Sequence, residues 1–338
     1  MTGTTSASEP PGSAPLRHRS LTAVEENLRR RPLFSRRLVI NMGKGGVGKS
    51  AVSAAMALLA QRRGLKVLLV QLDARDRISE YLGSSPVTQE VNEVLPGLDC
   101  VNISPEAALR EYVLLQVRLE AIYKLVFKNR FVSAFLKAVP ALSDLVMLGK
   151  VEYHLRQTGP GGAPLYDLVI VDPPPTGHGM FFLKTPFVMA DAARSGPIRE
   201  HSLRMAGLLS DQARCAINLV TLPEEMPVAE TIDACADLSW GLNIIPHLLL
   251  VNRYTPSPYR EDEQQVIRQV LRGVTDLKRE ALLSVVGQDM DRARLRDAHV
   301  AALDAQLGMQ RLCLPELVSE RFGRDEVERL CAVMEEAL

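Results

Sequence analysis

The chain has 338 residues, of which 46% are hydrophobic and 24% charged, a composition typical of a soluble protein with one or two domains and a large core. Its 40 Lys and Arg residues balance its 40 Asp and Glu residues. Binding along nucleic acid depends on many phosphate contacts from a basic surface, so we expect no nucleic-acid partner. No apolar run approaches the roughly 18 residues of a membrane-spanning helix.

Residues 1–31 predict a disordered, basic N-terminal tail. The first part is rich in Ser, Thr, Pro and Gly, and the second part is rich in arginine. A solvated tail is the simpler interpretation, and a docking or lipid-facing arm is the alternative. Residues 32–338 are expected to form the folded domain.

A short apolar strand is predicted at 37–42, followed by a glycine-rich loop and a helix at 49–62. The loop satisfies the phosphate-loop pattern G-x-x-x-x-G-K-[ST] and predicts a nucleoside triphosphate site made by Gly43, Lys44, Gly45, Gly46, Val47, Gly48, Lys49, Ser50 and Ala51. Glycines let successive backbone amides turn toward phosphate oxygens, and the helix adds its positive dipole end. We expect Lys49 to contact the β- and γ-phosphates and Ser50 to bind Mg²⁺.

Two further apolar runs end in an aspartate. The run at 66–72 precedes Asp73, and the run at 166–172 ends in Asp172. Ligands bind at the carboxyl ends of strands in open α/β sheets. We therefore predict a doubly wound, mostly parallel sheet, in which Asp73 orients a water or acts on Mg²⁺ through water, and Asp172 supports the ion through water.

Residues 104–160, between these two aspartates, predict a helical cap inserted into the sheet domain. Ser104-Pro105-Glu106 is a strong helix start, and apolar residues recur at helical spacing in three segments. Packing of these apolar faces on one another is the simpler interpretation, and an exposed groove for a client is the alternative. Beyond the cap, the sequence predicts a strand at 248–252 and helices at 259–272, 279–307 and 325–338.

The segment Lys44-Gly-Gly-Val-Gly-Lys-Ser50 resembles the deviant Walker A loop of the MinD/ParA/ArsA group of ATPases, and Asp172-Pro-Pro-Pro-Thr-Gly-His178 resembles the signature of its ArsA-like members. These include the arsenite-pump ATPase and the ATPase that delivers tail-anchored membrane proteins. The similarity runs from about Arg37 to the C-terminus. Asp73-Ala-Arg75 and residues 138–150 most resemble the actinobacterial anion-transporting branch of these ATPases.

The resemblance implies several roles for residues. Lys44 would cross a dimer interface and act on the nucleotide of the other subunit, as an arginine finger does elsewhere. Asn252 would recognise adenine, beside a closing loop that contains Pro315. The switch segment would comprise Pro175, Thr176, Gly177 and His178. Catalysis would thus rest on Lys44, Lys49 and Asp73.

Two departures from the family pattern bear on mechanism. The family usually reads Asp-Pro-Ala-His after the second strand, whereas this chain reads Asp73-Ala-Arg-Asp76, which puts nucleotide-driven motion of that segment in question. The cysteines are dispersed with no C-x-x-C pair, which argues against a zinc-bridged dimer and against a clustered thiolate site for arsenite.

From these observations we expect an ATP- and Mg²⁺-dependent hydrolase that serves a membrane transport or targeting system. It would be a homodimer, or a heterodimer with a paralogous ATPase, whose partner is a membrane transporter or a hydrophobic client. A chaperone for hydrophobic segments and a slow, non-catalytic nucleotide switch remain as alternatives. With no signal peptide, the chain is expected to be cytoplasmic, and a peripheral position at the inner membrane face is compatible with this.

Overall fold

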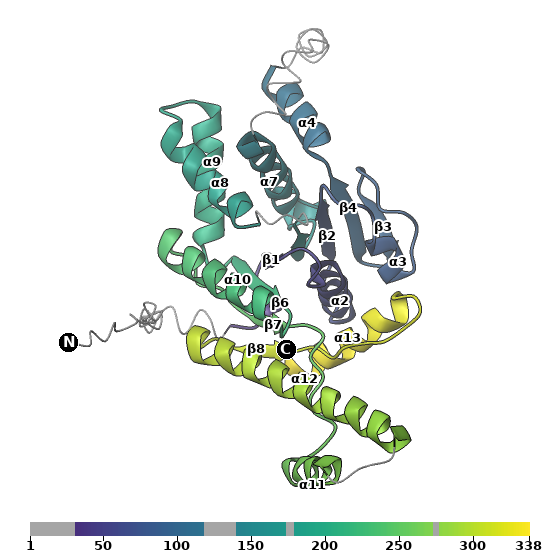
Figure 1. The fold of residues 1–338 in the computed structure, drawn as a ribbon. Helices are drawn as coiled ribbons and strands as arrows, with labels where there is room; N and C mark the ends of the chain where they lie inside the picture. Colours follow the sequence, from purple (N-terminus) through teal and green to yellow (C-terminus); the bar gives the residue numbers. More distant parts are fainter. Residues whose placement is uncertain (1–30, 118–139, 174–178, 273–276) are drawn as a thin grey trace, which may run out of the picture.

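The computed structural model describes residues 31–117, 140–173, 179–272 and 277–338 (Figure 1). Nearly all of the predicted tail, the switch residues 175–178 and the middle of the predicted cap lie outside the described residues. The elements, in chain order, are η1 (Leu33–Ser35), β1 (Leu38–Met42), α2 (Lys49–Arg62), β2 (Val67–Leu72), α3 (Ile78–Leu82), β3 (Asn92–Leu95), β4 (Leu98–Ile103), α4 (Pro105–Val117), α7 (Pro140–Arg156), η2 (Pro160–Gly162), β5 (Leu168–Asp172), α8 (Gly179–Ala192), α9 (Pro197–Ser210), β6 (Cys215–Thr221), α10 (Glu225–Ala236), η3 (Asp237–Gly241), β7 (Leu249–Val251), α11 (Glu261–Arg272), α12 (Leu277–Leu307), β8 (Arg311–Cys313) and α13 (Arg324–Ala337).

In the described part of the chain, eight strands form one sheet in the order β3-β4-β2-β5-β1-β6-β7-β8. All neighbours pair in parallel except β3 and β4, which pair antiparallel at one edge. The central strands are buried along their whole length, as near-continuous apolar runs predict for a sheet covered on both faces. The predicted doubly wound α/β fold is confirmed.

Helices cover both faces of this sheet (Figure 1). On one face, α2 packs against β1, β2 and β5 and is itself covered by α13. Because it lies between two layers, α2 is apolar on nearly all sides, and its alanines and leucines are almost all buried. On the other face, α7 packs on β5, while α9 and α10 pack on β6.

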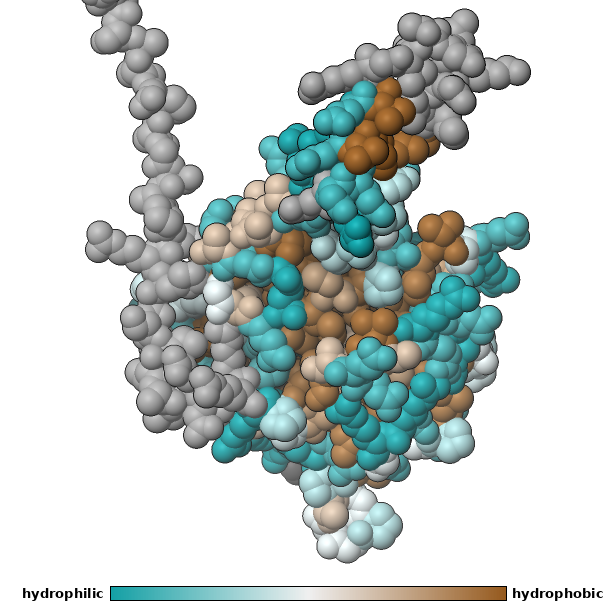
Figure 2. Space-filling view, turned by 90° about the horizontal axis from the view of Figure 1, so that it is seen from below, coloured by the Kyte–Doolittle hydropathy of each residue, from teal (hydrophilic) through white to brown (hydrophobic). Residues whose placement is uncertain are grey.

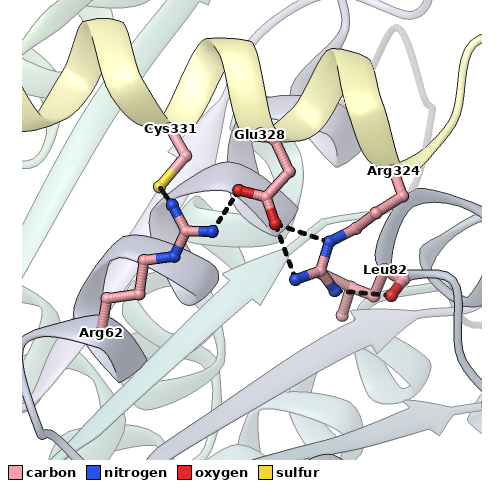
Figure 3. Close-up of polar contacts among 5 residues, drawn as sticks. All are labelled: Arg62, Leu82, Arg324, Glu328 and Cys331. Carbon is pink, nitrogen blue, oxygen red and sulfur yellow. Dashed lines mark hydrogen bonds and ion pairs between the residues drawn. The ribbon is translucent and has the colours of Figure 1, made fainter.

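Polar contacts tie α13 to the end of α2 and to α3 (Figure 3). Glu328 of α13 accepts hydrogen bonds from Arg62 of α2 and, at 2.8 Å, from Arg324 Nε. The same Arg324 side chain donates to the Leu82 carbonyl at the end of α3, at 2.7 Å. Such partly exposed pairs contribute only about 0.2–1 kcal/mol each, so the apolar contact between α13 and α2 provides most of the attachment.

Helices α4 and α7 lie within the predicted cap insertion, whose residues 118–139 are outside the described part. Hydrophobic residues on α7 face inward, and Leu145, Leu148, Val151 and Leu155 are buried in the core. Helix α11 lies apart from the sheet and exposes Val266 and Val270 (Figure 1). Seen from below, polar residues cover much of the surface and hydrophobic residues show in a band between them (Figure 2). Within the described residues, no helix is long and apolar enough to cross a membrane.

Candidate nucleotide-binding site

The glycine-rich loop lies between β1 and α2, as the sequence predicts, and two of its glycines are required by space and backbone geometry. Gly43 has φ +157°, and a Cβ there would lie 2.1 Å from the Val220 carbonyl oxygen. Gly48 has φ +93°, and a Cβ there would lie 2.2 Å from Nδ2 of Asn252. No other residue fits either position without displacing its neighbours, so the loop can pass this close to β6 and β7 only with glycine.

Lys49, the first residue of α2, folds back along the loop. Its Nζ donates hydrogen bonds to the carbonyl oxygens of Gly43, at 2.9 Å, and Lys44, at 2.8 Å. Burial lowers the pKa of this amine, while the nearby Asp172 carboxylate raises it. The loop therefore holds a buried ammonium group at a helix N-terminus, where positive charge and free amides together favour an anion such as phosphate.

Asp172 ends β5 directly beside this loop. Its side chain is 1% exposed, and burial raises its pKa to about 6, although a hydrogen bond from Ser50 and the charge of Lys49 lower it. Its Oδ1 is buried and has no hydrogen-bond partner among the described residues. A serine hydroxyl beside a carboxylate oxygen that lacks a partner is the hard oxygen donor set that Mg²⁺ prefers, so these residues fit the predicted ion.

Asp73 follows β2, the strand next to β5. Its backbone has φ +46°, and its amide donates to the Ile103 carbonyl at 2.9 Å. Burial, followed by the charge of Glu106, raises the pKa of its carboxyl. Asp76 stabilises the same loop, because its two oxygens accept the backbone amides of Ser79 and Val87. Asp76, which stands where the family sequence usually has another residue, therefore stabilises the loop that follows β2.

Lys44 is paired within the single chain, and its predicted action across a dimer interface stays a prediction. Within the single chain, its Nζ donates to Oε1 of Glu230 on α10 at 2.5 Å. Both side chains are partly exposed. The pair borders a cavity of about 310 Å³ that Met42, Met180 and Thr231 also line.

Asn252 and Pro315 follow β7 and β8, which are neighbours, so both lie at the carboxyl edge of the sheet. Asn252 is buried, and its Nδ2 donates to the Val47 carbonyl of the glycine loop at 2.9 Å. The donor of this amide is therefore engaged with the loop, and adenine recognition by Asn252 stays a prediction.

Comparison with known proteins agrees with this geometry. The model of the family described as anion-transporting ATPase matches residues 36–195. ATPase BagA of Mycobacterium tuberculosis is 31% identical over 226 residues, which cover 65% of this chain and 66% of that protein. The chain belongs to the ArsA family of ATPases. An arsenical pump-driving ATPase from Escherichia coli is 26% identical over 229 residues, covering 63% of this chain and 39% of the relative. ATPase GET3 of Kluyveromyces lactis is 28% identical over 173 residues, covering 46% of this chain and 49% of that protein. The chain thus spans about two thirds or less of the length of these relatives.

The structure of this ArsA-family chain brings together Lys49, Ser50 and Asp172, with Asp73 on the adjacent strand. The predicted switch residues 175–178 lie outside the described residues. Sequence reasoning missed the pairing of Lys44 with Glu230 and a set of buried amides beneath the loop, which includes Asn41 and Asn218. The only sequence signal for the amides is that they interrupt otherwise apolar strands.

Proposed function

We propose that this chain is a Mg²⁺-dependent ATPase that couples ATP binding and hydrolysis to a conformational cycle. The observation that carries the proposal is the grouping of Lys49, Ser50 and Asp172 around the glycine loop. When bound, Mg²⁺ would neutralise charge on the β- and γ-phosphates. Ser50 and Asp172 would hold it, Asp172 through water.

The chain's own residues account for the remaining steps. Lys49, already held within the loop, balances the charge of the phosphates. Asp73 orients the attacking water in line with the transferred phosphoryl group. Burial, and then the charge of Glu106, raise the pKa of its carboxyl, which makes the group a stronger hydrogen-bond acceptor for that water.

We further propose that the active form is a dimer, either of this chain alone or with a paralogue, and that Lys44 reaches the nucleotide of the other subunit. In the single chain Lys44 is paired with Glu230, and the pair is partly exposed, so little free energy holds it there. Similarity to an arsenical pump-driving ATPase supports a role with a membrane transport system. Similarity to ATPase GET3 is compatible with the alternative role, in membrane-protein targeting.

The test measures ATP turnover together with mass by light scattering, with ATP, with ADP and without nucleotide. Wild type and Lys44→Ala are compared, and Lys49→Ala serves as the control for loss of binding. Hydrolysis together with an ATP-dependent dimer, both lost in Lys44→Ala, would support the proposal. ATP binding with neither turnover nor a change in mass would refute the homodimeric ATPase.

A further inference from the structure

Helices α4, α7 and α9 form a second cavity. Helix α7 packs against both α4 and α9, and all three helices contribute residues to the cavity lining. The cavity has a volume of about 680 Å³, a size typical of pockets for small molecules. Its lining residues are separate from those of the glycine loop, so its ligand is a question apart from the nucleotide.

One face of α7 forms the floor of this cavity. Val146, Gly149, Lys150 and Tyr153 recur at the three- and four-residue spacing of a single helix face, and all four line the cavity. The opposite face of α7 carries the leucines that are buried in the core. A face that only packed against neighbouring helices would be apolar as well, whereas this face carries a charged group and an aromatic hydroxyl.

Each of the three helices contributes one aromatic ring to the cavity, namely Tyr112 on α4, Tyr153 on α7 and His201 on α9. The ring centroids of Tyr112 and His201 are 6.1 Å apart. Gly149 allows the buried His201 ring to lie against α7, because a Cβ at this position would lie 2.3 Å from Nε2. Glycine weakens the interior of a helix, so its place in the middle of α7 is explained by the ring that it admits. The lining therefore suits an aromatic ligand.

The charged groups that line the cavity do not balance. The cations are Lys150, Arg156 and Arg204, and the carboxylates are Glu111 and Glu152. Lys150 of α7 pairs with Glu111 of α4. Oε1 of Glu152 is shared by Nη1 of Arg156, at 3.8 Å, and Nε of Arg204, at 3.4 Å. Because one carboxylate faces two guanidinium groups, the lining has an excess of positive charge.

The imidazole of His201 leaves this excess unchanged. Nη2 of Arg204 lies 3.1 Å from Nδ1 of His201. A guanidinium group only donates, so Nδ1 accepts and the ring is neutral. Burial lowers the pKa of His201, although Glu152 raises it, and the lowered pKa agrees with a neutral ring. His201 therefore contributes an aromatic surface and no charge.

We propose that the cavity binds a small aromatic carboxylate. Its ring lies among Tyr112, Tyr153 and His201, since aromatic rings favour offset or edge-to-face contacts with one another. Its carboxylate accepts hydrogen bonds from Arg156 and Arg204, because guanidinium groups bind carboxylates through two parallel donors. These arginine side chains are 69% and 48% exposed, so each can turn toward a ligand at little cost. The inference goes beyond the proposed ATPase and does not depend on it.

Isothermal titration calorimetry on the full chain, without nucleotide, tests this proposal. The probes are naphthylacetate and its neutral counterpart naphthylacetamide, which share the ring and differ in charge. We expect wild type to bind naphthylacetate about tenfold more tightly than the amide, because hydrogen bonds to a charged group are the stronger ones. Arg204→Gln should remove most of this preference and leave the affinity for the amide unchanged.

The matched control is Arg199→Gln, because Arg199 lies on the same helix outside the cavity lining. It should bind both probes as wild type does. Tyr153→Ala removes a half-exposed ring and should weaken the binding of both probes about fivefold, while the preference for the anion stays. The proposal is overturned if neither probe binds at millimolar concentration, if wild type binds the two equally, or if Arg199→Gln loses the preference as Arg204→Gln does.

Discussion

Replacing Asp172 by asparagine should stabilise the fold while it damages the site. The buried carboxyl has a pKa of about 6, against an ordinary value of 3.8. The folded state therefore binds this proton more tightly than the unfolded state does. The stability that protonation provides is complete below about pH 4 and is lost as the pH rises through 6.

The size of the effect follows from the shift. About two pKa units correspond to ~3 kcal/mol, which is the cost of keeping this carboxylate ionised in the folded chain at neutral pH. Asparagine removes that cost, but it also removes the negative charge beside the buried ammonium of Lys49, whose pKa burial already lowers. We therefore expect a net gain of ~1–3 kcal/mol at pH 7.5.

Urea unfolding of the nucleotide-free wild type and of Asp172→Asn, at pH values from 4 to 8, measures this difference. The difference in unfolding free energy should be near zero at pH 4 and grow between pH 4 and pH 7, since other titrating groups are common to both proteins. In a parallel assay, the variant should lose the Mg²⁺-dependent part of ATP affinity. A variant that is less stable than wild type at pH 7.5, or a difference that does not change with pH, would refute the reasoning.

The remaining predictions concern the glycine loop and its partners. Lys44→Ala should abolish turnover and leave ATP binding largely intact, whereas Glu230→Gln, which releases Lys44 from a partly exposed pair, should raise turnover by no more than about fivefold. Steady-state kinetics at saturating ATP measure the turnover of both variants. A lower rate in Glu230→Gln than in wild type would show that the pair helps catalysis. Gly43→Ala should lower the free energy of unfolding by ~2–4 kcal/mol, because the new Cβ would meet the carbonyl of Val220. Gly46→Ala would meet nothing within 4 Å and should lower the free energy of unfolding only by the ~1 kcal/mol of backbone strain. Equal losses of unfolding free energy in urea would show that the contact with the strand carbonyl does not matter. Asn252→Ala should lower the free energy of unfolding by ~1 kcal/mol, because the hydrogen bond to the glycine loop is lost. It should also reduce the preference for ATP over GTP in competition binding. If this preference is unchanged, Asn252 does not recognise adenine.

The central sheet was predictable because its strands are buried on both faces and so appear as apolar runs with clear ends. The phosphate loop was predictable because a short motif, a strand and a helix must occur in a fixed order. Strands β4, β6 and β8 were not predicted, and neither was the edge strand β3, in which only two of the four residues are apolar and none is buried.

The contacts of the site were less predictable than its members. Lys44 was singled out from the sequence, but its partner Glu230 lies 186 residues further along the chain. The contact between the buried amides Asn41 and Asn218 depends on strand register, which a single sequence does not contain. The rule that ligands bind at the carboxyl edge was enough to place Asp73 and Asp172 at that edge, and the structure adds that their strands β2 and β5 are neighbours.

The position of α13 also affects how the molecule comes together during synthesis. The helix that follows the glycine loop is made early, yet the helix that covers its outer side, α13, is made much later. Until then a nascent chain exposes one apolar side of α2, and the contacts that bury it join segments about 270 residues apart, such as Arg62 and Glu328 at a separation of 266. Closing so long a loop is slow, so the growing chain exposes this apolar surface until α13 has been made and has docked on α2.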